Sequence, residues 1–250
     1  MVRRSARPAR SAVKSRVKPR LTIREVTDVA DPALKESYGL LRRTFHRGER
    51  VTLADWRGTM VERMSGLWTD LAWHLLVAER DGQVVGLASG TYLGNVNLGV
   101  IGYLAISPDV RSTGIGSRLR TRLRAVFGRD ALRIAGAPMS GIIGEVSSEN
   151  PWLKVLAKRE NVLVLDFQYF QPRLYPGDAA SPFVLYHESL TGTRRSLPVG
   201  ELRRILYTVW RRIYRVSRPL GRPAFRKMMR ALDGRRTVGH ARAFNRRARP

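Results

Sequence analysis

The chain has 250 residues, of which 43% are hydrophobic and 26% are charged. These values are close to the averages of globular domains, so they exclude wholesale disorder and a collagen-like chain. The sequence contains no cysteine, which excludes disulfides, thiolate metal sites and a cysteine nucleophile. No apolar run approaches the roughly 18 residues of a membrane-spanning helix.

Charge is the unusual property, because 46 Lys and Arg residues face 20 Asp and Glu residues, for a net charge of +26. Residues 1–20 hold eight basic residues and no acidic one, and residues 194–250 hold eighteen basic and two acidic residues. The middle of the chain, residues 21–193, is almost neutral. We therefore expect a disordered basic arm over 1–20, a folded domain over 21–193 and a basic helical extension over 194–250.

The middle segment alternates between strand and helix patterns. In chain order these patterns predict a strand over 21–26, a helix over 32–45 capped by Asp31, a helix from Thr52, strands over 75–79 and 84–92, a strand over 100–106, a helix from Ile115, a strand over 142–146, a short helix over 152–160, and strands over 162–170 and 183–188. The Asp81-Gly82 pair between the second and third strands is typical of a tight hairpin turn.

The most informative stretch is Arg111-Ser112-Thr113-Gly114-Ile115-Gly116, which lies between a predicted strand and a predicted helix. The two glycines let the backbone approach a ligand closely, and the amides at a helix N-terminus suit phosphate oxygens. The pattern therefore predicts an anion site of the kind that binds a pyrophosphate. It is not a Walker loop, because no Gly-Lys-Ser/Thr follows, and it is not a dinucleotide fingerprint, because Gly-x-Gly-x-x-Gly is absent.

This motif and the order of elements around it resemble the GNAT superfamily of acyl-CoA-dependent acyltransferases, whose motif is Arg/Gln-x-x-Gly-x-Gly/Ala. The resemblance extends from Leu21 to about Leu190 and implies an α/β (α+β) fold with a mixed, mostly antiparallel central sheet flanked by helices. It implies that main-chain amides from Arg111 to Ser117 bind the pyrophosphate of acetyl-CoA or another acyl-CoA as co-substrate. It also implies that a strand edge pairs with the pantetheine arm, at Leu104, Ala105 and Ile106.

Each catalytic candidate has both a catalytic and a structural interpretation. Glu145 lies on the strand expected to splay from the cofactor strand, so its carboxylate is either a general base or substrate anchor, or a structural ion-pair partner. Glu149 shares this ambiguity. Many GNAT proteins have a tyrosine acid on the next helix, where this chain has Ala157, so Tyr103 and Tyr169 are substitutes unless both are structural. The four histidines lack metal-ligand spacing, and no metal site is predicted.

The two basic segments leave several interpretations open. The arm over 1–20 is a solubilising tail, an electrostatic tether or an organelle transit peptide. Residues 198–214 predict an amphipathic helix, residues 225–232 a shorter one, and residues 237–250 a disordered end. The apolar stripe of the first helix packs on the same chain or a second copy, or it lies in an anionic membrane with Trp210 and Tyr214 at headgroup level. Binding to nucleic acid is the third interpretation.

Taken together, the sequence predicts a cytoplasmic N-acetyltransferase, with peripheral membrane association as a further possibility. It would transfer an acetyl or other acyl group from acetyl-CoA directly to an amine of a small molecule or a protein, through a ternary complex. Two other classes stay open: a non-catalytic acyl-CoA-binding module, and a scaffold that binds nucleic acid or an anionic membrane through its basic arms. A homodimer is compatible with the sequence, which identifies neither the acceptor nor the acyl length.

Overall fold

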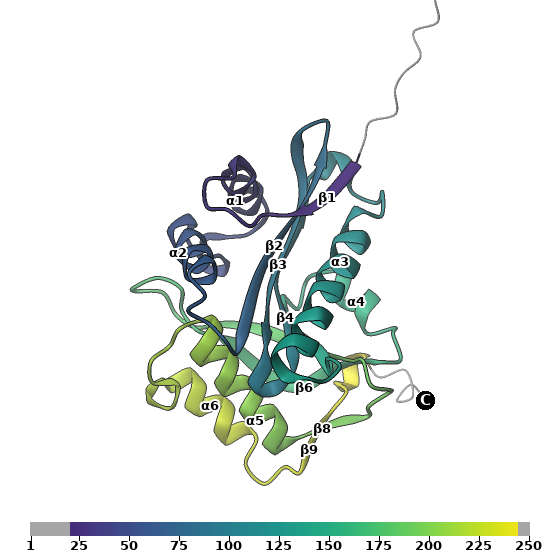
Figure 1. Cartoon of the computed structure of the whole chain (residues 1–250). Helices are drawn as coiled ribbons and strands as arrows, with labels where there is room; N and C mark the ends of the chain where they lie inside the picture. The colour runs from purple at the N-terminus through teal and green to yellow at the C-terminus, as the bar shows by residue number, and fades with distance from the viewer. Residues whose placement is uncertain (1–20, 245–250) are drawn as a thin grey trace, which may run out of the picture.

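The computed structural model describes residues 21–244 and contains a seven-stranded sheet with helices on both faces (Figure 1). The strands of the sheet are β1 (Leu21–Glu25), β2 (Leu71–Arg80), β3 (Gln83–Leu93), β4 (Leu98–Ile106), β5 (Gly141–Val146), β6 (Val162–Gln171) and β7 (Ser181–Ser189). The helices are α1 (Pro32–Thr44), α2 (Leu53–Met64), α3 (Ile115–Asp130), α4 (Trp152–Leu156), α5 (Val199–Thr208) and α6 (Pro223–Ala231). A two-stranded sheet joins β8 (Ser196–Pro198) and β9 (Thr237–Gly239).

Local sequence signals account for several of these elements. The Asp31 side chain accepts from the Ala33 amide at 2.9 Å and caps α1, which begins with a proline. Thr52 and Asp55 form a reciprocal capping box at the start of α2. At the β2–β3 hairpin both turn residues have positive φ, 52° at Asp81 and 79° at Gly82, as a two-residue primed turn requires. These three predictions are confirmed.

The central sheet is mixed and splits at one place. Its strand order is β1-β2-β3-β4-β5-β7-β6, and the β4–β5 pair alone is parallel among the described strands. This pairing begins at Leu98 and ends at Ile101, opposite Gly144, although both strands continue. Gly102 has no partner in β3, because Ser89 pairs with Tyr103 and Gly90 with Ile101. Such a bulge bends a strand, and here it coincides with the divergence of β4 from β5.

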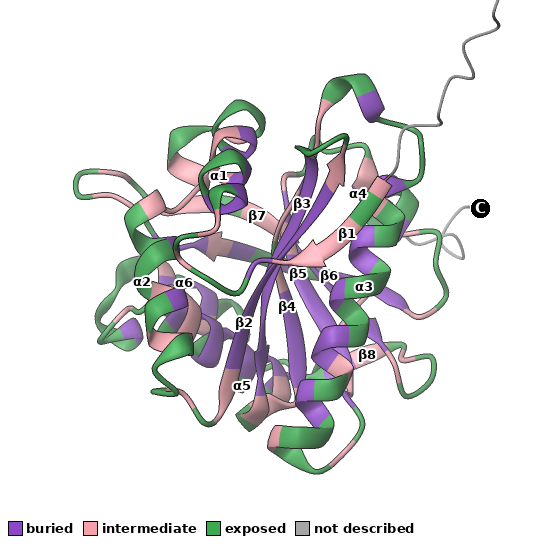
Figure 2. Cartoon of the chain, turned by 45° about the horizontal axis from the view of Figure 1, so that its top comes forward, coloured by how far each residue is buried: buried purple, intermediate pink, exposed green. Residues whose placement is uncertain are grey.

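Helices cover both faces of the sheet. The helices α3 and α4 lie on one face, and α1, α2, α5 and α6 lie on the other (Figure 1). The strands between them are largely buried (Figure 2), and β2 has seven consecutive buried residues. Strands sandwiched in this way read as continuous apolar runs rather than as alternating ones. For this reason the sequence pattern located the middle of β2 but missed its first four residues.

The C-terminal extension packs on the same chain. The helix α5 continues into a π-helical turn, η5 (Val209–Ile213), and the apolar stripe along both shares one hydrophobic core with β4, β6 and α6. Trp210 is 1% exposed within this core. The membrane interpretation that placed Trp210 and Tyr214 at headgroup level is therefore wrong for these two side chains, because the sheet already covers the stripe. Within residues 21–244, every helix falls short of the length and apolar character that crossing a bilayer requires.

Two predicted segments differ from the structure. The helix expected over 152–160 ends at Leu156, because the chain turns at residues 157–161 to begin β6. Residues 237–239, placed in a disordered end by the sequence, form β9, where Val238 is fully buried against the extension. A strand of three residues carries too short a pattern for sequence analysis to detect. The predicted arm over 1–20 and the predicted disorder of residues 245–250 lie outside the described residues.

Candidate active site

The loop between β4 and α3 has the geometry of an anion-binding site. Gly114 precedes α3 with a φ of +82°, a left-handed conformation that costs glycine little. A Cβ at this position would meet no atom within 4 Å, so the space beside the turn is open. The Arg118 amide donates to the Gly114 carbonyl at 3.1 Å, and the amides just before it have no acceptor inside the helix. These amides lie at the positive end of the helix dipole, which suits phosphate oxygens.

The other predicted loop residues surround the same turn. Arg111 is exposed, and its Nε atom donates to the Ile106 carbonyl at 3.4 Å. The Thr113 hydroxyl donates to the Val110 carbonyl at 2.7 Å and closes the turn before the helix. Ser112 is exposed and has a φ of +63°. The first turn of α3 contains the remaining predicted residues, Ile115, Gly116 and Ser117.

The edge of β4 beside this loop faces the split in the sheet. Leu104, Ala105 and Ile106 pair with β3 on one side. On the other side, no strand of the described chain pairs with β4 beyond Ile101. A strand edge of this kind offers backbone donors and acceptors to an extended ligand, which can bind as an added strand.

Glu145 lies on β5 just past the last residue that pairs with β4. Its carboxylate accepts two hydrogen bonds, one from the Tyr169 hydroxyl to Oε1 at 2.7 Å and one from the Tyr214 hydroxyl to Oε2 at 2.6 Å. Tyr169 belongs to β6 and is 0% exposed, whereas Glu145 and Tyr214 are half-buried. Within residues 21–244 no Lys, Arg or His forms a salt bridge to Glu145.

The surroundings of Glu145 change its acidity. Burial raises the pKa of the Glu145 carboxyl to about 7, although the two tyrosine hydroxyls partly offset this effect by stabilising the carboxylate. Burial and the neighbouring carboxylate raise the pKa of Tyr169 and of Tyr214 well above the ordinary value, so both hydroxyls keep their protons. The cluster therefore combines a carboxylate that exchanges a proton near neutral pH with two fixed hydroxyl donors.

Tyr214 comes from the C-terminal extension and was missed as a candidate by the sequence analysis. Its amide donates to the Val209 carbonyl at 3.2 Å, so Tyr214 ends the π-helical turn η5. The next residue, Arg215, forms a salt bridge of 2.5 Å with Glu62 of α2, and Arg212 pairs with Asp70. These contacts hold the segment after α5 against the first half of the chain. The sequence signal was limited to a place on the apolar stripe, which indicates burial and not function.

The other two sequence candidates make no hydrogen bond to this carboxylate. The Tyr103 hydroxyl accepts from the Val51 amide at 3.0 Å and donates to the Glu49 carbonyl at 3.2 Å, so it braces the connection between α1 and α2. Glu149 is exposed in the turn after β5. The structure thus brings Tyr169 to Glu145 but brings neither Tyr103 nor Glu149 into hydrogen-bond contact with it.

Two connections meet near the same end of the sheet. The Tyr175 hydroxyl, between β6 and β7, donates to the Arg50 carbonyl at 2.9 Å, between α1 and α2. The Arg47 guanidinium lies 4.0 Å from the centre of the Tyr175 ring and 3.6 Å from Asp178. The Tyr103 hydroxyl contacts the connection between α1 and α2, and burial, with a smaller effect of the Glu145 charge, raises its pKa. Residues of this region are candidates for contacting an acceptor.

Comparison with known proteins agrees with this geometry. Residues 41–135 match the acetyltransferase (GNAT) family. A GNAT-family protein from Bacteroides thetaiotaomicron has a structure that superposes with a TM-score of 0.57 at 17% identity, over 78% of this chain and 99% of that chain. No curated protein matches the sequence with significant similarity.

Other solved structures are similar at a lower level. They include the ribosomal-protein-alanine N-acetyltransferase of Brucella melitensis, with a TM-score of 0.48 and 21% identity over 68% of this chain and 99% of that one. They also include yncA from Salmonella typhimurium, solved with its cofactor acetyl-CoA, with a TM-score of 0.47 and 18% identity over 70% of this chain and 96% of that one.

The split mixed sheet and the loop at the start of α3 define the class of protein, which is an α/β protein with the GNAT fold. Residues 41–135, from the end of α1 to the end of the helical segment after α3, carry the match to the GNAT acetyltransferase family.

Proposed function

We propose that the protein is an N-acyltransferase that transfers an acyl group, with acetyl as the simplest case, directly from acyl-CoA to an amine of a small molecule or a protein. The observation that carries this proposal is the placement of Glu145 at the split in the sheet, with a pKa near 7 and two tyrosine donors. A carboxylate with this pKa can accept a proton from the ammonium form of the acceptor at neutral pH, which leaves the neutral amine free to attack.

Three features of the chain fit acyl-CoA. The amides at the start of α3 would hold the pyrophosphate, and the open space beside Gly114 leaves room for it. The β4 edge from Tyr103 to Ile106 would hold the pantetheine chain through backbone hydrogen bonds. When bound, acyl-CoA supplies the acyl group as an activated thioester.

The residues around the split divide the proton transfers between them. The Glu145 carboxylate takes a proton from the acceptor amine and makes it nucleophilic. Tyr169 and Tyr214 hold the carboxylate in one orientation through both of its oxygens. Tyr214 keeps some exposure, so its hydroxyl is the better placed of the two to pass a proton to a departing thiolate, while its oxygen regains a proton from the newly protonated Glu145 carboxyl. Tyr214 would then take the role of the helix tyrosine of many GNAT proteins, in whose place this chain has Ala157.

The test is release of free thiol from acetyl-CoA in the presence of a panel of primary amines. The chain has no cysteine, so the protein adds no thiol background. Glu145→Gln keeps the shape of the side chain and removes its charge, and should reduce turnover by about 10²–10⁴-fold. Tyr214→Phe should reduce turnover less and shift the acidic limb of the pH profile upward, because the carboxylate loses a donor.

Glu149→Gln is the matched control, since Glu149 is exposed and lies four residues further along the chain. It should turn over like the wild type. If the wild type binds coenzyme A but releases no thiol with any amine, the protein is an acyl-CoA-binding module. If Glu145→Gln turns over normally, the base lies elsewhere and the assignment of Glu145 is wrong.

A further inference from the structure

The outer surface of the extension carries positive charge that ion pairs do not neutralise. The salt bridges of α5, α6 and the segments beside them use Arg194, Arg203, Arg212, Arg215 and Arg235. Between residues 204 and 230, six arginines are exposed and have no carboxylate within salt-bridge distance among the described residues: Arg204, Arg211, Arg218, Arg222, Arg226 and Arg230. We call this surface the α5–α6 face.

Several of these arginines share one side of a helix. Arg222, Arg226 and Arg230 follow one another at four-residue intervals at the start of and along α6, and such positions lie one above the other. Arg226 Nη1 donates to the Leu220 and Gly221 carbonyls at 3.3 and 3.1 Å, so its guanidinium lies against the turn before α6. Arg226 therefore lies against this turn, and Arg218 and Arg222 flank it in the sequence.

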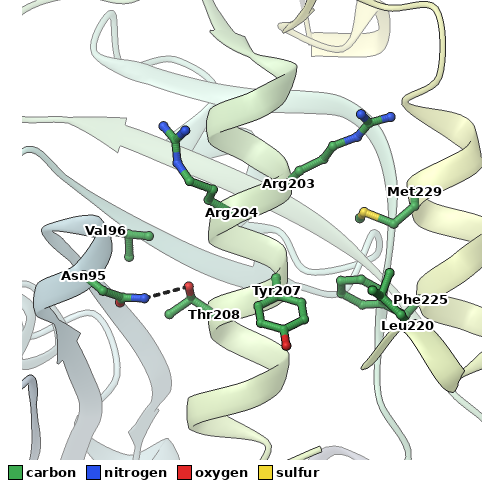
Figure 3. Close-up of a pocket in the computed structure, with 9 residues that line it drawn as sticks. All are labelled: Asn95, Val96, Arg203, Arg204, Tyr207, Thr208, Leu220, Phe225 and Met229. Carbon is green, nitrogen blue, oxygen red and sulfur yellow. Dashed lines mark hydrogen bonds between the residues drawn. The ribbon is translucent and has the colours of Figure 1, made fainter. Parts of the chain in front are cut away.

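Apolar groups are exposed at the same place. Leu220, at the tip of that turn, is 61% exposed, and Tyr207 on α5 is 43% exposed. Both side chains line a pocket of about 410 Å³ between α5, α6 and residues 95–96, with Phe225 and Met229 on its wall and Arg203 and Arg204 at one end (Figure 3). The Tyr207 ring lies beside the Phe225 ring, with the two ring centres 6.3 Å apart (Figure 3). Exposed apolar residues grouped in this way mark a binding surface more often than single ones do.

We propose that the α5–α6 face docks the protein onto an anionic lipid bilayer, with Leu220 and Tyr207 entering the interface and the six arginines contacting lipid headgroups. A surface that combines exposed apolar side chains with surrounding cations is suited to the boundary between headgroups and acyl chains. Binding to nucleic acid would use the same charges, but it would gain nothing from an exposed leucine at the tip of a turn. The apolar content of this face therefore favours a membrane.

This docking does not require the core to open. The apolar stripe of α5 packs on the sheet, and the docking contacts come from the exposed side chains of the α5–α6 face. The proposal is independent of catalysis, because none of its residues touches Glu145 or the loop at the start of α3.

The test is flotation of the full-length chain with vesicles of phosphatidylcholine that contain about 30% phosphatidylglycerol, over a range of salt concentrations. The wild type should bind these vesicles, lose affinity as salt rises, and not bind vesicles of phosphatidylcholine alone. Arg204→Glu/Arg222→Glu/Arg230→Glu should lose about 100-fold or more in affinity, since each basic residue near the surface contributes about a factor of five.

The matched control is Arg42→Glu/Arg57→Glu/Arg129→Glu, which changes the net charge equally at three exposed arginines of α1, α2 and α3. It should lose clearly less affinity than the α5–α6 variant, because both proteins keep the arm over residues 1–20 and the same total charge. Equal losses in the two triple variants would show that charge anywhere on the chain suffices, and would overturn the proposal.

Leu220→Ala distinguishes a membrane from nucleic acid, because it removes apolar area and leaves the charge unchanged. Leu220→Ala should weaken vesicle binding by several-fold, through the loss of apolar area. Leu220→Asp also adds a negative charge and should weaken vesicle binding by about tenfold more. Binding to a duplex DNA should not change in Leu220→Ala. If Leu220→Ala binds vesicles like the wild type, or if the wild type binds duplex DNA and not vesicles, the face does not dock onto a bilayer. Unchanged coenzyme A affinity and circular dichroism spectra would show that each variant is folded.

Discussion

The environment of Glu145 leads to a prediction that does not depend on knowing the acceptor. The pKa of its carboxyl rises from the ordinary value of 4.5 to about 7 in the folded protein, because burial disfavours the charged form. The folded state therefore binds this proton more tightly than the unfolded state does. Ionisation of Glu145 costs stability that is absent at low pH and grows as the pH rises through the interval between these two values.

The magnitude follows from the size of the rise in pKa. One pKa unit corresponds to about 1.4 kcal/mol, so the full cost above neutral pH is about 3 kcal/mol. Glutamine cannot ionise and avoids this cost. The free energy of unfolding of Glu145→Gln minus that of the wild type should therefore increase by about 2–3 kcal/mol between about pH 5 and about pH 8. Any loss from altered hydrogen bonds to the two tyrosines is present at both pH values and cancels in this comparison.

Urea unfolding of both proteins, followed by circular dichroism at each pH, measures this difference. Glu149→Gln serves as the control, because Glu149 is exposed, and its difference from the wild type should not vary with pH in this way. A difference for Glu145→Gln that stays constant from acidic to alkaline pH would refute the reasoning. The carboxyl would then titrate as an ordinary solvated group, and its fitness as a base near neutral pH would lose its physical support.

Three further predictions concern other parts of the chain. Gly114→Val should weaken coenzyme A binding by about tenfold or more in calorimetry, because a branched residue at a φ of +82° strains the loop; Gly128→Val, in open space on the same helix, should not. His74 lies between the carboxylates of Glu25 and Asp130; burial lowers its pKa, but the two carboxylates outweigh this effect and raise it. His74→Gln should therefore lower the free energy of unfolding, measured in urea, by about 3 kcal/mol below about pH 6, and by less as the pH rises through the raised pKa. Trp210→Ala should cost about 3–5 kcal/mol by the same measurement, whereas Leu220→Ala should cost little.

Short-range patterns in the sequence were sufficient for most of the local structure. The caps at Asp31 and Thr52 and the Asp81-Gly82 turn each depend on residues within three or four positions, so they could be identified without the fold. The loop that ends at Gly114 was identified for the same reason, since its chemistry comes from consecutive backbone amides. The positions of β9 and of the end of α4 could not be predicted, because they depend on which surface the chain packs against.

The residues of the candidate site also differ in whether the sequence alone identifies them. Glu145 could be selected from the sequence because it lies on a strand next to the expected split, and carboxylates are the common bases for such chemistry. Its partner Tyr214 lies 69 residues away, in a segment whose sequence indicates only an apolar helix with a basic face. The tertiary structure alone brings that helix onto the sheet, removes water from around the carboxylate and raises its pKa. These effects depend on groups from β5, β6 and the extension meeting in space, and no local sequence pattern encodes that meeting.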